Sequence, residues 1–198
     1  ASICYWACSE HARDGPRARH YHYPPFQIVA KSPRSCRSAV IIHVCFLFAD
    51  DQTTWNCSAW RCHMLSNAIN REHEKNPKRF PHTAKMWSLE SSIAVHHPAV
   101  QSKIGIADVI VFQRNVFVEP IWDAMDYWKA LSKVVVVDLD DHYPNIPASN
   151  PAFQYWIQNV HKMDPPPVER LAEGLKHADA LISPSNVILE DWKDIVPG

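Results

Sequence analysis

The sequence predicts an α/β protein with a doubly wound, mostly parallel sheet. Short runs of apolar and β-branched residues alternate along the chain with longer stretches in which apolar residues recur every three or four positions. The strongest runs, at 39–48 and 134–137, are almost continuously apolar, which is typical of strands buried on both faces of a parallel sheet. Strands that alternate with helices in this way are joined by right-handed crossovers.

Each element follows from these patterns and from the polar or proline-rich segments between them. Asn56 or Ser58 can cap the first helix, and Asn76-Pro77 ends it. The segment 143–151 is a loop rich in Pro and Asn. The expected strands are 39–48, 84–89, 107–113, 133–141 and 178–183, and the expected helices are 57–74, 120–132, 153–163, 168–177 and 186–193.

Composition places the fold in the later part of the chain. Of the 198 residues 46% are hydrophobic and 21% charged, which excludes wholesale disorder. Residues 1–38 have no helical or strand period and carry six basic and two acidic side chains. We expect this segment to be a disordered or non-native tail, and residues 39–198 to form the folded domain.

Charge and apolar runs exclude several classes of partner. Residues 99–198 carry fourteen acidic and eight basic side chains, so a nucleic-acid partner is not expected. The longest apolar run, Ala39 to Ala49, is 11 residues long and contains His43, whereas a membrane span needs roughly 20 apolar residues. No secretory signal segment is visible. We therefore expect a cytoplasmic protein without a membrane span.

The glycine and cysteine patterns exclude the common cofactor motifs. The chain has only four glycines, and neither a G-x-G-x-x-G fingerprint nor a Walker loop is present, which argues against a Rossmann dehydrogenase and a P-loop NTPase. All six cysteines lie in the first 62 residues without zinc spacing, so reduced thiols are expected. We expect no cofactor and no metal site.

Ligands of a doubly wound sheet bind outside the carboxyl ends of its strands. This rule selects, as candidate site residues, those that follow the expected strands: Asp50, Asp51, Arg114, 140–142 and 183–186.

An acidic cluster at the end of the strongest strand is the most informative of these features. Asp138 follows four valines, so we expect it to be partly buried and structural, while Asp140 and Asp141 face the cleft. Adjacent carboxylates suit a general base or a divalent-metal site, and an acidic strand end can also cap the following loop. Arg114 can bind an anionic ligand or pair with the aspartates, and His142 is a general base or a surface histidine.

Several motifs in order resemble the N-terminal half of GT-B glycosyltransferases of the family 4-like group. They are Trp60-Arg61, the stretch from Ala107 to Arg114, the stretch from Lys133 to Asp141, and the closing stretch from Ala178 to Ser185. The resemblance covers about 160 residues. It implies a Rossmann-like domain that is one half of a GT-B fold, with the C-terminal donor domain absent from this chain.

The resemblance also implies a function. The chain is then the acceptor-side half of a retaining, metal-independent hexosyltransferase-like enzyme. It moves a sugar from a nucleotide-sugar donor, held mostly by the missing domain, to a glycan, lipid or small-molecule acceptor. The expected catalytic residues are Asp140 and Asp141, and the expected substrate-binding residues are Arg61, Arg114, His142, Ser183 and Ser185.

Two other functions stay open at this stage. One is a non-catalytic module that binds a glycan or a protein partner. The other is a metal-dependent enzyme with a D-x-D motif, either a GT-A transferase or a haloacid-dehalogenase-like phosphatase. The position of Asp138-Leu139-Asp140 on a late strand, followed by Asp141-His142, counts against the phosphatase.

Overall fold

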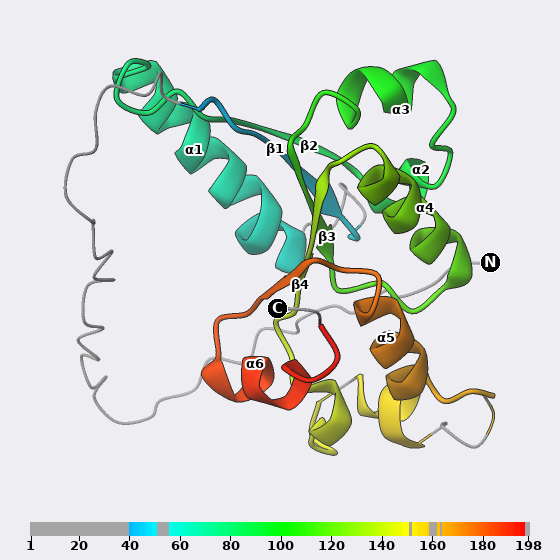
Figure 1. Cartoon of the computed structure of the whole chain (residues 1–198). Helices are drawn as coiled ribbons and strands as arrows, with labels where there is room; N and C mark the ends of the chain where they lie inside the picture. The colour runs from blue at the N-terminus through cyan, green and yellow to red at the C-terminus, as the bar shows by residue number, and fades with distance from the viewer. Residues whose placement is uncertain (1–39, 51–55, 151, 159–161, 163, 197–198) are drawn as a thin grey trace, which may run out of the picture. The chain divides into compact units, whose positions relative to one another are not determined.

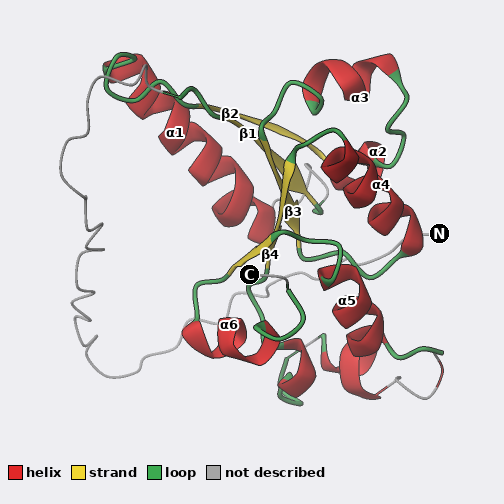
Figure 2. Cartoon of the chain, in the orientation of Figure 1, coloured by secondary structure: helices red, strands yellow, loops and turns green. Residues whose placement is uncertain are grey.

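The fold is a five-stranded parallel sheet with helices on both faces, which confirms the predicted α/β, doubly wound, Rossmann-like class (Figures 1 and 2). The computed structural model describes residues 40–50, 56–150, 152–158, 162 and 164–196, so the expected tail over 1–38 lies outside the described residues. The strands stand in the order β2-β1-β3-β4-β5. They are β1 (His43–Phe48), β2 (Thr83–Ser88), β3 (Val109–Gln113), β4 (Val134–Asp138) and β5 (Ala180–Ile182).

The helices divide between the two faces of the sheet. A π-helical turn, η2 (Ala59–His63), continues directly into α1 (Met64–Lys75), which packs on one face. The other face carries α2 (Leu89–Ser92), α3 (Pro98–Lys103), α4 (Glu119–Ala130) and α5 (Pro167–Leu175) (Figure 1). The remaining elements are η3 (Tyr143–Asn145), η4 (Gln154–Gln158) and α6 (Asn186–Trp192). Within the described ranges, no helix is both long and apolar enough to cross a membrane.

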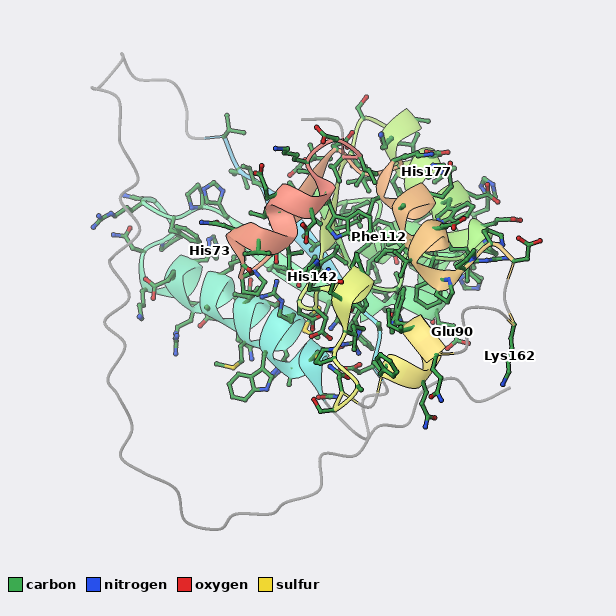
Figure 3. All side chains as sticks on the ribbon, turned by 90° about the horizontal axis from the view of Figure 1, so that it is seen from below. His73, Glu90, Phe112, His142, Lys162 and His177 are labelled. Carbon is green, nitrogen blue, oxygen red and sulfur yellow. The ribbon has the colours of Figure 1, made fainter. Side chains whose placement is uncertain are left out.

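Side-chain alternation along the strands builds two cores. In β1, Cys45 and Leu47 pack into the larger core under α4 and α5, while Phe46 and Phe48 pack into the smaller core under α1. This alternation is the period of two that every strand imposes, and here both faces are covered, so both sets are apolar. Figure 3 shows Phe112, which is fully buried, in the interior of the packed side chains.

Two aspartates that directly precede strands accept hydrogen bonds from the amino ends of the adjacent strands. The Asp108 carboxylate accepts the backbone N–H of His43 at 2.8 Å, and Asp179 accepts the N–H of Val135 at 2.8 Å. In return, the N–H groups of Asp108 and Asp179 donate to the carbonyls of His43 and Val135. The repeated Ala-Asp pattern before β3 and β5 therefore has a structural role, because it satisfies backbone donors at the start of adjacent strands.

Gly174 lets α5 approach the segment between β3 and α4 closely. A Cβ atom at Gly174 would lie 1.6 Å from the carbonyl oxygen of Val116 and 2.7 Å from Nε1 of Trp122. That indole nitrogen itself donates to the Val116 carbonyl at 2.7 Å. The absence of a side chain at position 174 therefore allows the helix to pack here.

The strand order changes direction between β1 and β3. From β1 the chain passes to β2 on one side, and from β2 it crosses β1 to reach β3 on the other side. The order 2-1-3-4-5 is that of flavodoxin-like doubly wound sheets, whose ligands bind at the carboxyl ends of β1 and β3. Residues that follow these two strands, and β4 beside them, therefore form the candidate site.

Candidate functional site at the carboxyl edge of the sheet

The carboxyl ends of β1, β3 and β4 bring together charged side chains that are far apart in the sequence. Asp50 follows β1, Arg114 follows β3, and Asp138 is the last residue of β4. Gln113 and Asp138 are partners in the parallel register and face the α1 side of the sheet, as Val111 and Val136 do. The helical segment formed by η2 and α1 covers that side, so its first turns meet these strand ends.

The first turns of this helical segment present Ser58, Arg61 and Cys62 to the strand ends. Their spacing of three and four residues places them on one face of the helix. Arg61 binds Asp138 with two hydrogen bonds, one from Nε to Oδ2 at 2.8 Å and one from Nη2 to Oδ1. The Asp138 side chain is only 4% exposed, so this carboxylate is more deeply buried than the partly buried position expected from the sequence. Burial raises the pKa of Asp138, and the Arg61 guanidinium opposes this shift.

Asp50 joins the start of the same helical segment to β3. Its Oδ2 accepts the backbone N–H of Ser58 at 2.7 Å, and its own N–H donates to the Ser58 hydroxyl at 3.1 Å. Its Oδ1 accepts a hydrogen bond from Nη2 of Arg114 at 2.8 Å. One carboxylate thus binds both a backbone donor and a guanidinium.

Arg114 has a backbone conformation that few residues other than glycine adopt. Its φ is 35°, in the left-handed region, and its N–H donates to the carbonyl of Asp138 at 3.0 Å. This conformation brings the guanidinium to Asp50 and also places Nη1 3.5 Å from Oδ2 of Asp140. Strained backbone of this kind is concentrated at functional sites, where the surrounding contacts hold it in place.

Asp140 and Asp141 have different surroundings. The phenol of Tyr143 donates to Oδ1 of Asp140 at 3.3 Å, and Arg114 pairs with the other carboxylate oxygen. Asp141 is half-buried, and its carboxylate has no hydrogen bond or ion pair to any residue that the structure describes. Burial, together with the negative charge of Asp140, raises the pKa of Asp141.

The other expected substrate-binding residues make local contacts. Nε2 of His142 lies 2.5 Å from Oδ2 of Asp191, which ties the loop after β4 to α6, and Figure 3 shows His142 beside α6. The Ser183 hydroxyl accepts the N–H of Ser185 at 3.3 Å. The Ser185 hydroxyl accepts the N–H of Val187 at 3.2 Å, as an N-cap of α6. These two serines thus shape the turn between β5 and α6.

Gln113 belongs to the site but escaped the sequence analysis. Its Oε1 accepts hydrogen bonds from the N–H of Ala49 at 2.9 Å and from the Ser58 hydroxyl, and the Cys62 thiol donates to it at 3.8 Å. Because a backbone N–H can only donate, the orientation of the amide is determined. The amide nitrogen is buried and has no partner among the described residues. A polar residue that ends the apolar strand 109–113 was the available signal.

Neither a metal cluster nor a thiolate is present in the described site. In residues 40–50, 56–150, 152–158, 162 and 164–196, no three His, Cys, Asp or Glu side chains converge as a metal site requires. Burial raises the pKa of the Cys62 thiol to about 12, so the thiol stays protonated at neutral pH and is a weak nucleophile.

Comparison of the chain with known protein families, with curated proteins and with solved structures finds no match. The chemistry of the site therefore has to be inferred from its own residues.

Proposed function

We propose that this chain forms the acceptor-side part of a glycosyltransferase, which moves a sugar from a nucleotide-activated donor to an acceptor hydroxyl. The observation that carries the proposal is the contrast between Asp140 and Asp141 at the carboxyl edge of the sheet. Asp140 is held by Tyr143 and Arg114, whereas the carboxylate of Asp141 keeps its lone pairs free of described partners. A general base needs such a free, partly buried carboxylate beside a positioned one.

The proposed chemistry assigns a different task to each carboxylate. Asp141 accepts a hydrogen bond from the acceptor hydroxyl and takes its proton as the new C–O bond forms at the anomeric carbon, on the same face from which the donor phosphate leaves, as retention of configuration requires. The bond between that carbon and the donor phosphate oxygen breaks, and the nucleoside diphosphate leaves with the electron pair. The raised pKa of Asp141 makes it a better proton acceptor than an ordinary surface aspartate.

The arginines and His142 have supporting roles in this proposal. Arg61 and Arg114 are engaged by Asp138, Asp50 and Asp140, so they position the carboxylates instead of presenting free positive charge. His142 is directed toward Asp191, which leaves proton transfer to Asp141. The ordered resemblance of residues 39–198 to the family 4-like group is the reason for proposing this class of enzyme, and the donor would be bound mostly by residues outside it.

The test is an assay of the full-length protein with a panel of nucleotide sugars and hydroxyl acceptors, read as release of nucleoside diphosphate. We expect Asp141→Asn to lower turnover by about 10²–10⁴-fold with its fold intact. The matched control is Asp123→Asn, which makes the same change at an exposed position on α4 and should retain wild-type turnover.

Other outcomes would select the alternative functions. Wild-type turnover in both Asp140→Asn and Asp141→Asn contradicts the assignment of these residues. Turnover that requires added Mn²⁺ favours the metal-dependent enzyme, and glycan binding without turnover favours a binding module.

A further inference from the structure

Asp50 makes the contacts that a phosphate group makes in many doubly wound proteins. Such sheets bind phosphate between the first strand and the following helix, through backbone N–H groups and positive side chains. Here the backbone N–H of Ser58 and the guanidinium of Arg114 occupy that position, and both donate to the Asp50 carboxylate, at 2.7 and 2.8 Å. The side chain of Asp50 is only 10% exposed, so a bound phosphate could not share these donors with it.

The charge of the surrounding groups also disfavours an anion. Four carboxylates lie at this edge, and the two arginines that balance part of their charge are both in ion pairs with them. The fourth carboxylate, Asp141, forms no ion pair with a described residue, and the attraction of Arg114 only partly opposes the effect of burial and of Asp140 on its pKa. An anionic ligand would meet excess negative charge and would have to displace an existing ion pair.

Gln113 indicates which chemistry fits instead. Its amide belongs to the same network, is 1% exposed, and has an N–H group without a described partner. A buried donor left unsatisfied costs about 1–3 kcal/mol, so an acceptor atom that reached this amide would be favoured there. At Asp141 a hydroxyl group can donate to the carboxylate without adding charge, whereas a phosphate would add charge, so the carboxylates of this edge select the hydroxyl.

We propose that Asp50 is a built-in counterion that occupies a latent phosphate position, so that the ligand bound against Asp50 is an uncharged hydroxyl compound and a phosphate group is excluded from that position. This inference rests on the proposed function only where the ligand is identified as the acceptor. The exclusion of anions is a property of the chain that can be measured without any transfer activity.

The experiment titrates inorganic phosphate into three forms of the chain and follows binding by calorimetry and thermal unfolding. Asp50→Ala frees the Ser58 N–H and Nη2 of Arg114, while Nη1 of Arg114 stays paired with Asp140. Asp108→Ala is the matched control, because Asp108 also accepts a backbone N–H, with the same change of charge, at the opposite edge of the sheet. A third form, Asp50→Ala with Arg114→Gln, removes the guanidinium as well.

We expect phosphate to bind Asp50→Ala at least about tenfold more tightly than wild type or Asp108→Ala, and to raise its Tm accordingly. The additional Arg114→Gln substitution should abolish this gain.

Saturable phosphate binding by the wild type that depends on Arg114 would overturn the proposal. The proposal would also be overturned if Asp50→Ala bound phosphate no more tightly than Asp108→Ala and if phosphate raised the Tm of the two variants equally. The same conclusion would hold if Asp50→Ala were unfolded and phosphate did not restore its fold. If the variants bind phosphate as expected while the full-length protein transfers no sugar, the role of Asp50 as a counterion is supported and only the proposed function is contradicted.

Discussion

Arg61 and Asp138 are 77 positions apart in the sequence, yet the guanidinium of one binds both carboxylate oxygens of the other. Arg61 comes from the π-helical turn that precedes α1, and Asp138 ends β4, so the pair holds the first helix against the carboxyl end of β4. Because the carboxylate is nearly fully buried, removal of one partner would leave a buried charge unpaired and would destabilise the fold.

Removal of one member of this pair should destabilise the fold. Asp138→Asn leaves the Arg61 guanidinium partly buried without its counterion. This cost outweighs the relief of the buried charge that raises the pKa of Asp138, because Asn cannot accept both hydrogen bonds of the guanidinium. We expect a loss of about 3 kcal/mol in the free energy of unfolding, measured in urea. Lys75→Ala removes an exposed ion pair with Glu72 and should leave the free energy of unfolding close to that of the wild type. Equal effects of the two substitutions would contradict a structural role for Asp138.

Asp141→Asn should stabilise the fold at neutral pH. Because burial and Asp140 raise the pKa of Asp141 in the folded state, its protonated form favours folding. Its contribution to stability is therefore fully present below the unfolded pKa and is lost as the pH rises through the folded pKa. The amide stays neutral, so the variant should have a higher Tm than the wild type at pH 7.

The pH dependence of this difference provides the check. Thermal unfolding of both forms between pH 4 and 8 should show Tm curves that converge toward acid pH, near the ordinary carboxyl pKa of about 4. A constant difference across this range, or a less stable variant at pH 7, would show that the carboxylate is not strained by its surroundings. Such a trade of stability for a reactive group is common at functional sites.

Gly174→Ala should be severely destabilising. The added methyl group would lie 1.6 Å from the Val116 carbonyl oxygen, which is backbone and cannot rotate away. We expect a loss of more than about 3 kcal/mol in denaturant unfolding, or no folded protein. Glu173→Ala, on the same helix, loses only an exposed contact with Lys176 and should change stability by less than about 0.5 kcal/mol.

Gln113→Leu should lower the free energy of unfolding, although an apolar side chain would ordinarily suit a position that is fully buried. The leucine removes the acceptor of the Ala49 N–H and of the Ser58 hydroxyl, and unsatisfied buried donors cost about 1–3 kcal/mol. The same substitution at the exposed Gln154 should change the free energy of unfolding by less than about 0.5 kcal/mol. A neutral effect at position 113 would show that the network around its amide does not support the site.

The long elements could be predicted from sequence because their patterns repeat over enough residues. The run of valines at 134–137 is β4, and the helical period at 120–132 corresponds to α4. The short helices α2 and α3 were missed, because four and six residues hold too few turns for a period to appear. The helix expected over 153–163 is a π-helical turn at Gln154–Gln158 in the described residues, while 159–161 and 163 lie outside them.

Most of the charged residues of the site could be predicted from the sequence, but the ion pairs that they form could not. The rule that ligands bind at carboxyl strand ends selected Asp50, Arg114, Asp140 and Asp141, and three of these are joined by ion pairs. Asp51 lies outside the described residues. Gln113 escaped notice because a glutamine at a strand end has many ordinary roles. Ser58 was expected only as a possible helix cap, but its hydroxyl makes no capping hydrogen bond and donates to Gln113 instead.

The sequence by itself determined the class of the sheet, the position of its strands and the acidic character of its carboxyl edge, because these depend on local periodicity and on which residues follow each strand. Only the tertiary structure decided that Asp50 binds Arg114 and that Arg61 binds Asp138. Those pairs depend on the strand order β2-β1-β3-β4-β5 and on its register, which bring together residues 64 and 77 positions apart. A periodic pattern encodes which face a side chain takes, but it carries no information about which strand lies beside which.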